Sequence, residues 1–223
     1  MQLVIANKNY SSWSLRPWLL LKHFGIPFEE IHIWLAQDDT AQQILKYSPS
    51  GRIPCLIDTD HRSIWDSLAI AETLAERFPQ HAFWPRDAAA RAHARSVRAE
   101  MHSGFAALRQ DMPMKIRSVL PGQGATAGAL ADVARIDAIW RECLKEYGGP
   151  YLFGEFSIAD AMFAPVVMRF NTYRPALSPE AAAYAANLSA LPAMQLWIAE
   201  AQAEGHVIAR YEGAANPASS AAA

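Results

Sequence analysis

The sequence predicts an α/β domain followed by an all-α helical domain, and three observations favour this fold class. Strand-like and helix-like hydrophobic periods alternate over residues 1–79, whereas only helix-like periods follow. Residues 80–87 contain a proline and separate the two patterns, as a linker does. With 223 residues, 52% of them hydrophobic, the chain has enough apolar material for two small domains. We expect domains at 1–79 and 88–212, a linker at 80–87 and a flexible tail at 213–223.

The elements expected in the first domain follow the order strand, helix, strand, loop or short helix, strand, strand, helix. A short apolar run predicts the first strand at 3–6. The helix expected at 15–24 has Pro17 in its first turn and Gly25 just past its end, which are ordinary start and stop signals. The later elements are expected at 28–33 (strand), 42–47 (loop or short helix), 53–57 and 63–65 (strands around a turn) and 67–78 (helix).

Only helices are expected after the linker. Apolar residues at helical spacing predict four of them, at 88–111, 127–147, 158–173 and 192–204. Glycine and proline separate these segments. The small and polar residues that end the chain are typical of a frayed tail.

The net charge and the cysteine content exclude several classes of function. A formal net charge of −2 and a pI near 6.4 give no basic surface for nucleic acid or anionic lipid. Cys55 and Cys143 lie too far apart in the sequence for a metal knuckle or a disulfide framework. No apolar run approaches the roughly eighteen residues of a membrane span, and the first residues do not resemble a signal peptide. We expect a cytoplasmic protein with no metal ion, no nucleic-acid partner and no membrane attachment.

The first candidate functional residues lie where the first strand gives way to the first helix. Tyr10, Ser11, Ser12 and Trp13 follow one another there. A hydroxyl at a helix N-terminus lies where backbone N–H groups are unpaired and the helix dipole is positive. Such a hydroxyl can cap the helix, or it can donate a hydrogen bond to a bound anion such as a thiolate. The sequence leaves both roles open.

Two further short motifs lie later in the first domain. Pro54 follows Ile53 at the start of a strand, and a cis bond there would turn the Ile53 backbone toward the first helix, where a peptide-like ligand could pair with it. Asp66 and Ser67 begin the last helix of this domain. They can serve as a cap, or Ser67 can hold a carboxylate while Asp66 holds an ammonium group. In the second role they would bind the head group of an α-amino acid.

In this order, the three motifs resemble the glutathione-binding domain of the cytosolic glutathione S-transferases. The strand–helix–strand unit followed by a hairpin and a helix is similar to the thioredoxin-like fold of that domain. The resemblance covers essentially the whole chain, because the family also has an all-helical second domain, whose signature is similar to the segment 156–160 ahead of an apolar helix. It implies a thioredoxin-like N-terminal domain that binds glutathione and an all-helical C-terminal domain that forms the electrophile pocket.

The segment 11–16 indicates a class within the family. It resembles the Ser-Ser-Cys-Ser-x-Arg stretch of zeta-class enzymes, so the chain is similar to bacterial, serine-type members. Counting back from Gly25 by the spacing of the zeta and delta classes gives Ser11 as the catalytic residue. The cysteine of the beta class would fall at Trp13. Ser12 and Tyr10 remain alternatives for the catalytic hydroxyl.

The resemblance also implies where glutathione binds. The acid–serine pair that holds the γ-glutamyl group matches Asp66 and Ser67. The family's glutamine for the glycine carboxylate falls near Asp39, which has the wrong charge, so Arg52, Lys46 and Gln42 stay open for that role. The expected glutathione-binding residues are Ser11, Ser12, Arg52, Ile53, Pro54, Asp66 and Ser67.

The electrophile pocket is expected to include Trp13 and three side chains of the helical domain, Met101, Phe105 and Met112, although core packing explains these three equally well. His102 is expected at the surface or at an interface. Candidates for holding an anionic substrate are Arg16, Arg98, Arg109 and Arg117.

The resemblance implies a homodimeric detoxification enzyme that uses glutathione as co-substrate and makes its thiol a thiolate for attack on small electrophiles. A zeta-like, glutathione-dependent cis–trans isomerase of the maleylacetoacetate isomerase type is an alternative, and it needs cations for two carboxylates. A non-catalytic binding or assembly protein of the same fold is a third interpretation.

Overall fold

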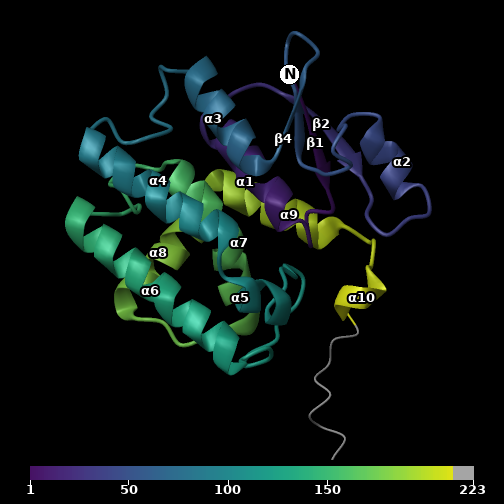
Figure 1. The fold of residues 1–223 in the computed structure, drawn as a ribbon. Helices are drawn as coiled ribbons and strands as arrows, with labels where there is room; N and C mark the ends of the chain where they lie inside the picture. Colours follow the sequence, from purple (N-terminus) through teal and green to yellow (C-terminus); the bar gives the residue numbers. More distant parts are fainter. Residues whose placement is uncertain (213–223) are drawn as a thin grey trace, which may run out of the picture.

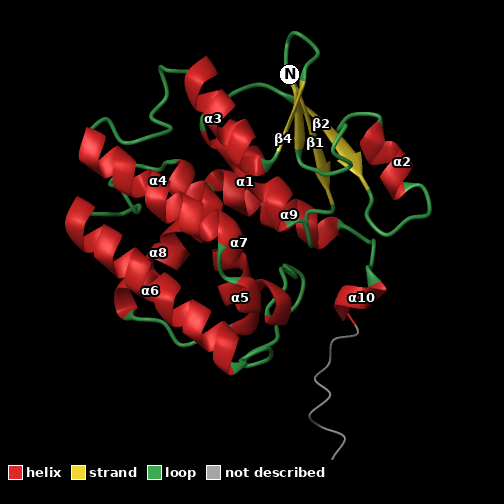
Figure 2. Cartoon of the chain, in the orientation of Figure 1, coloured by secondary structure: helices red, strands yellow, loops and turns green. Residues whose placement is uncertain are grey.

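A mixed sheet and three helices form the N-terminal part of the protein (Figure 2), as seen in a computed structural model that describes residues 1–212. The tail expected at 213–223 lies outside the described residues. The sheet has the order β2-β1-β3-β4, with β1 parallel to β2 and antiparallel to β3, and β3 antiparallel to β4. Its strands are β1 (Gln2–Ala6), β2 (Glu29–Ile33), β3 (Cys55–Ile57) and β4 (Ser63–Trp65), and the helices are α1 (Ser12–His23), α2 (Thr40–Leu45) and α3 (Ser67–Arg77). This is the thioredoxin-like order that the sequence predicts.

The C-terminal part is helical (Figure 1). Its helices are α4 (Ala88–Ser103), α5 (Ala106–Asp111), α6 (Ala127–Tyr147), α7 (Ile158–Tyr173), α8 (Pro179–Ser189), α9 (Pro192–Ala203) and α10 (Ala209–Glu212). No helix or strand lies between α3 and α4, which is where the linker is expected. The predicted fold class, an α/β domain followed by a helical domain, is therefore confirmed.

Helix α1 begins earlier than the apolar pattern indicates, because a serine caps it. Ser11 Oγ accepts a hydrogen bond from the N–H of Ser14 at 3.4 Å, so the helix starts at Ser12 rather than at 15. Gly25 follows the helix with φ of 64°, a left-handed conformation that glycine adopts without steric cost. The N-terminus of α1 is thereby fixed directly after β1.

The helix predicted over 88–111 is instead two helices, α4 and α5. A Cβ at Gly104 would lie 2.7 Å from the carbonyl oxygen of Glu100, and the next residue, Phe105, has φ of 61°. Arg109 stabilises the break, because its guanidinium donates to the carbonyl oxygens of Met101 and Gly104. The sequence prediction also lacked α8 and α10. For α8, Pro179 at its first position and a capping Ser178 were the available signals.

One apolar core runs through both parts of the structure. Helix α1 packs against α7 and α9 of the helical part and against α3 of its own domain. Trp18 of α1 and Trp197 of α9 are both fully buried, with ring centroids 5.0 Å apart. Since such contacts exclude water from the junction, the N-terminus of α1 has a fixed position relative to the helical domain.

Asp160 anchors the N-terminus of α7 through four hydrogen bonds. Its Oδ2 accepts from the N–H and the O–H of Ser157, at 2.9 and 3.1 Å. Its Oδ1 accepts from Leu152 N–H and from Tyr184 O–H, both at 3.0 Å. Ser157 in turn completes a capping box. Burial raises the pKa of Asp160 to about 6, and these hydrogen bonds act in the opposite direction.

Asp160→Ala is expected to lower the free energy of unfolding by about 3–5 kcal/mol, because it leaves buried donors without an acceptor. Tyr184→Phe removes one of those donors together with its bond, so a loss of only about 1 kcal/mol is expected. Denaturant unfolding of both variants at one pH measures the difference. Equal losses would contradict the anchoring role of the carboxylate.

Candidate active site

A cavity of about 1050 Å³ lies at the N-terminus of α1, with walls from both domains. All seven residues that the sequence suggests for glutathione line it: Ser11, Ser12, Arg52, Ile53, Pro54, Asp66 and Ser67. These residues come from the start of α1, the segment before β3 and the start of α3. The fold therefore brings together positions that are up to 56 residues apart, counted from Ser11 to Ser67.

Ser11 is buried at the start of α1, and its hydroxyl forms two hydrogen bonds. Its Oγ accepts from Ser14 N–H and donates to Ser14 Oγ at 2.7 Å. Ser14 Oγ also accepts from the N–H of Ala6 at 3.1 Å. Ser11 thus caps the helix and also lines the cavity. Its position is therefore compatible with both roles that the sequence suggests, helix capping and hydrogen bonding to a bound anion.

The two alternatives to Ser11 have different surroundings. Ser12 lines the cavity, and its hydroxyl forms no hydrogen bond within residues 1–212. Tyr10 also lines the cavity, but its hydroxyl donates to Glu212 at 2.5 Å and accepts from Arg117 at 3.1 Å. The Tyr10 hydroxyl is therefore already hydrogen-bonded to Glu212 and Arg117, whereas the Ser12 hydroxyl has no hydrogen-bond partner in the described part of the chain.

Asp66 and Ser67 present one charged and one neutral polar group at the start of α3. Asp66 Oδ1 accepts from Leu68 N–H at 2.7 Å, which caps the helix, and Asp66 has φ of 69°. A positive φ in a residue other than glycine is uncommon and is concentrated at functional sites. Ser67 is 1% exposed, and its Oγ forms no hydrogen bond with any described residue. A buried hydroxyl without a partner at a positive helix end is a ready donor for an anion.

The Ile53–Pro54 peptide bond is cis, and both residues lie in the cavity wall. Of the three residues that the sequence left open for the glycine carboxylate, only Arg52 lines the cavity. Lys46 instead donates to Gln43 at 2.7 Å, away from it. Gln42 is likewise absent from the lining residues.

The helical wall differs from the expected one. Trp13 lines the cavity as expected, but Met101, Phe105 and Met112 belong to the hydrophobic core and do not line it. Core packing thus accounts for these three residues. The residues that the helical domain does contribute are His102, Arg109, Pro113, Met114, Arg169 and Tyr211.

Three neighbouring arginines give this wall a positive charge: Arg109 and Arg169 line the cavity, and Arg16 is buried beside them. Arg16 is 1% exposed, and all three of its guanidinium nitrogens lack a hydrogen bond to residues 1–212. Burial, together with Arg109 and Arg169, holds the pKa of Arg16 well below its usual range. Burial and Arg109 likewise lower the pKa of Arg169 to about 9. Three adjacent cations, two of them with unused donors, favour the binding of an anion.

Arg169 was not predicted from the sequence. It lies within α7, whose other residues from Ala161 to Phe170 are apolar and buried. Its Nη1 donates to the carbonyl oxygen of Pro165 at 3.1 Å, and its Nε has no partner among the described residues. A single cation in a buried apolar run was the signal that could have identified it.

His102 lies in the cavity wall rather than at the surface. Its Nε2 is 3.5 Å from Asp66 Oδ2, and its ring meets Trp13 edge-on with centroids 5.3 Å apart. Burial lowers the pKa of His102, with Arg16 and Arg109 acting in the same direction and Asp66 in the opposite one. The histidine therefore bridges the helical domain and the Asp66 region.

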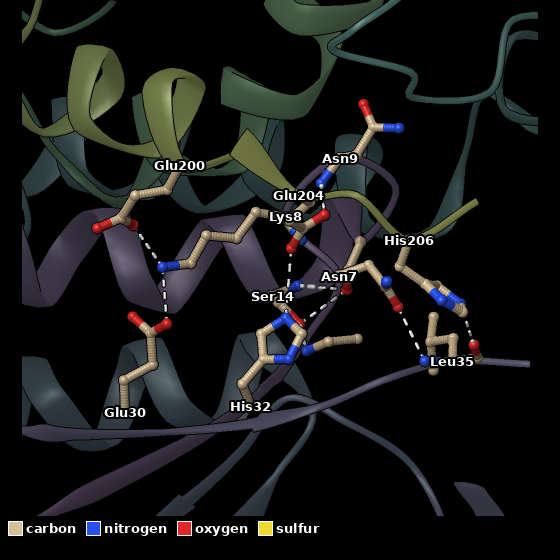
Figure 3. Close-up of polar contacts among 12 residues, drawn as sticks. Asn7, Lys8, Asn9, Ser14, Glu30, His32, Leu35, Glu200, Glu204 and His206 are labelled. Atoms are coloured by element: carbon tan, nitrogen blue, oxygen red, sulfur yellow. Dashed lines mark hydrogen bonds and ion pairs between the residues drawn. The ribbon is translucent and has the colours of Figure 1, made fainter. Parts of the chain in front are cut away.

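A polar network holds the loop between β1 and α1 against the C-terminal segment (Figure 3). Lys8 Nζ lies between Glu30 at 2.6 Å and Glu200 at 2.5 Å. Glu204 accepts from the backbone N–H groups of Lys8 and Asn9 at 2.5 and 3.0 Å. The loop that carries the candidate hydroxyls is thus fixed from both sides.

Other reactive groups are scarce in residues 1–212. Burial raises the pKa of both Cys55 and Cys143, the latter to about 12, so neither thiol is a ready nucleophile. Within the same residues, no three histidine, cysteine or acidic side chains lie together as a metal site would require. None of the helices described there is both long and apolar enough to span a bilayer.

Two family profiles match the chain. Residues 10–77 match the glutathione S-transferase N-terminal domain, and residues 123–200 match the glutathione S-transferase C-terminal domain. The maleylacetoacetate isomerase of Rattus norvegicus is 31% identical over 176 residues, which cover 75% of this chain and 77% of that protein. A probable maleylacetoacetate isomerase of Caenorhabditis elegans is 27% identical over 173 residues, or 75% of this chain and 78% of that protein.

Solved structures show the same fold. A holo maleyl pyruvate isomerase, described as a bacterial glutathione S-transferase of the zeta class, has a TM-score of 0.69 and 23% identity, covering 93% of this chain and 100% of that one. A glutathione transferase homolog from Burkholderia with bound glutathione has a TM-score of 0.68 and 24% identity. That likeness covers 91% of this chain and 98% of the other.

Proposed function

Because the chain belongs to the glutathione S-transferase family, we propose that the cavity at the start of α1 binds glutathione and holds its thiol as a nucleophilic thiolate. The protein is an enzyme of the transferase type, with glutathione as co-substrate. One observation carries the proposed site: the hydroxyls of Ser11 and Ser12 at the N-terminus of α1 and of Ser67 at that of α3 line one cavity. Two positive helix ends are suited to two of the anionic groups of one ligand, its thiolate and its γ-glutamyl carboxylate.

Each part of the tripeptide has a matching group in this proposal. The uncommitted Ser67 hydroxyl and the N-terminus of α3 hold the γ-glutamyl carboxylate, and Asp66 holds the ammonium group. The backbone of Ile53 pairs with the cysteinyl residue, as an added strand does. Arg52 pairs with the glycine carboxylate. The sulfur then lies against Ser11.

Ser11 is the proposed catalytic residue, which makes the enzyme a serine-type member of its family. A free thiol has a pKa of about 8.5, and lowering it by about two units stabilises the thiolate by about 2.7 kcal/mol. A charge-assisted hydrogen bond from a hydroxyl contributes about 1.5–3 kcal/mol, so one such bond is nearly sufficient. The thiolate attacks the electrophilic carbon, and the cavity positions the two reactants.

The arginine-rich wall favours an anionic electrophile. Arg16, Arg109 and Arg169 lie together; Arg109 and Arg169 line the cavity, and the unpaired Nε of Arg169 is a donor for a carboxylate. This observation supports a second candidate function, glutathione-dependent cis–trans isomerisation of a maleyl diketo acid. In that reaction the thiolate adds to the double bond, rotation follows about the resulting single bond, and glutathione leaves.

The test uses two substrates and one affinity measurement. We expect retention of the protein on immobilised glutathione and turnover of a chromogenic aryl halide, which identifies a transferase. Turnover of a maleyl diketo acid without net consumption of glutathione identifies the isomerase. Retention without turnover of either substrate would leave a binding protein and contradict catalysis. Absence of retention would contradict the proposed site.

The assembly and location of the protein are also proposals drawn from the family. We propose a homodimer in the cytoplasm, with a small electrophile as the second substrate. Light scattering coupled to size-exclusion chromatography is expected to give twice the chain mass of 24.6 kDa. A mass of one chain at micromolar concentration would contradict the dimer.

Asp66→Asn and Ser67→Ala are each expected to weaken glutathione binding by about tenfold, which corresponds to about 1.4 kcal/mol. Asparagine keeps an oxygen for the cap on Leu68 and tolerates a positive φ, so the Asp66 variant loses mainly charge. Isothermal titration calorimetry measures the dissociation constants. Unchanged binding in both variants would place the γ-glutamyl group elsewhere.

A further inference from the structure

Ser14 is the hydrogen-bond partner of the Ser11 hydroxyl. It is fully buried in the first turn of α1, and its Oγ accepts from Ala6 N–H at 3.1 Å and from Ser11 O–H at 2.7 Å. A serine hydroxyl has only one proton to donate. In this structure the Ser11 hydroxyl donates to Ser14 Oγ, so it has no further proton to donate to a sulfur atom.

The hydroxyl proton of Ser14, unlike that of Ser11, is available for a hydrogen bond. Ser14 Oγ accepts two hydrogen bonds but donates none to any described residue. The Ser11 oxygen lies 2.7 Å away and can accept. Rotation about the Cβ–Oγ bond of Ser14 can direct its O–H at Ser11 Oγ while Oγ still accepts from Ala6 N–H, and the Ser11 O–H can then turn toward the cavity.

We propose that Ser14 is a positioning residue whose hydroxyl reverses its bond with Ser11 when the glutathione thiolate binds. The inference rests on the proposed role of Ser11. In the bound state Ala6 N–H donates to Ser14, Ser14 O–H donates to Ser11, and Ser11 O–H donates to the sulfur. No covalent bond forms or breaks, and each hydroxyl keeps its own proton.

The reversed chain is favoured by the ligand's charge. A thiolate accepts a hydrogen bond more strongly than a neutral hydroxyl does, so the Ser11 proton moves to the stronger acceptor. Hydrogen bonds in series polarise one another, and the Ala6 amide at the end of β1 then supports the donor at the sulfur.

The test compares Ser14→Ala and Ser14→Thr with the unaltered protein. The pKa of the bound glutathione thiol is measured by ultraviolet absorption of the thiolate and by the pH dependence of kcat/KM. Ser14→Ala is expected to raise this pKa by about one unit, which is a tenfold loss of thiolate below it. Ser14→Thr keeps a hydroxyl and is expected to restore most of the shift. Ser14→Cys, with a much weaker donor of similar volume, replaces Ser14→Ala if that variant does not fold, with the pH–rate profile as its readout.

Two controls separate this inference from a structural effect. Binding of S-methylglutathione, which has no thiol, reports damage to the site that does not involve the sulfur. Ser48→Ala breaks another serine–serine hydrogen bond, in which the buried Ser48 and the exposed Ser50 lie 2.9 Å apart and only Ser50 lines the cavity. We expect no change of the thiol pKa in that variant.

The outcomes also separate the inference from the proposed function. If Ser11→Ala leaves the thiol pKa unchanged, the proposed role of Ser11 is wrong. If Ser11→Ala raises the pKa and Ser14→Ala or Ser14→Cys does not, Ser11 acts without Ser14 and this inference is overturned. If the Ser14 variants bind S-methylglutathione more weakly but leave the thiol pKa unchanged, the role of Ser14 is structural only and the inference is likewise overturned.

Discussion

Ser11→Ala is expected to lower kcat/KM for an aryl halide by about 10- to 100-fold at about pH 6.5, because it removes the proposed donor to the sulfur. The loss of about 1.5–3 kcal/mol raises the pKa of the bound thiol by about one to two units. Above that pKa the thiol ionises without help. The difference in kcat/KM between Ser11→Ala and the unaltered protein is therefore expected to shrink as the pH rises through about 9. A pH–rate profile of both proteins measures it.

The control for Ser11→Ala concerns the helix cap. Ser11 also accepts from Ser14 N–H, so the alanine variant loses about 1 kcal/mol of stability for a reason unrelated to chemistry. Thermal unfolding measures that part separately. A deficit that stays constant with pH would contradict thiolate stabilisation by Ser11. A shifted thiol pKa in Ser12→Ala but not in Ser11→Ala would assign the role to Ser12.

Arg169→Met is expected to lower kcat/KM for a dicarboxylate electrophile by about 100-fold and to leave the value for a neutral aryl halide within about twofold. A hydrogen bond to a charged group contributes about 1.5–3 kcal/mol, and an anion in the cavity also gains from the charge of Arg169. Methionine retains the apolar length of the side chain among its buried neighbours. Steady-state kinetics with the two substrates measures the ratio.

The stability of Arg169→Met supplies an independent check. The guanidinium is buried, has neighbouring cations, and no described residue forms a salt bridge with it. Its removal is therefore expected to cost little stability or to increase it. Arg141→Met, on the exposed side of α6 and outside the cavity, is the matched control. Equal losses for the dicarboxylate and the aryl halide would contradict charge recognition by Arg169.

The sequence predicts elements accurately where local signals agree. Helices α6 and α7 occupy the predicted residues 127–147 and 158–173 because a capping Thr126 or Ser157 precedes an unbroken apolar pattern in each. The break between α4 and α5 could not be predicted in the same way. A glycine within a helical pattern is tolerated. The break depends on the positive φ of Phe105 and on the hydrogen bonds of Arg109 to carbonyl groups at the end of α4, which the sequence pattern does not show.

The residues of the candidate site also fall into two groups, those that local sequence signals indicate and those that only tertiary packing brings together. Capping residues near helix starts are visible in the sequence, so the hydroxyls near Ser11 and Ser67 could be identified from the residue order, although α1 begins at Ser12 rather than at 15. An apolar side chain such as Met101 or Met112 satisfies a core and a cavity wall equally well, and only the tertiary packing distinguishes the two. Arg16 and Arg109 could be named as candidate anion ligands from the sequence. Their grouping with Arg169 depends on how α1, α5 and α7 meet in space.

The bond between Tyr10 and Glu212 spans 202 positions of the chain. Tyr211 lines the same cavity as Ser11, so the beginning and the end of the described chain share one wall. During synthesis, therefore, an intact cavity cannot exist until residues 211 and 212 have emerged from the ribosome. A nascent chain that already carries every proposed glutathione ligand, the last of which is Ser67, still lacks the part of the wall that Tyr211 supplies.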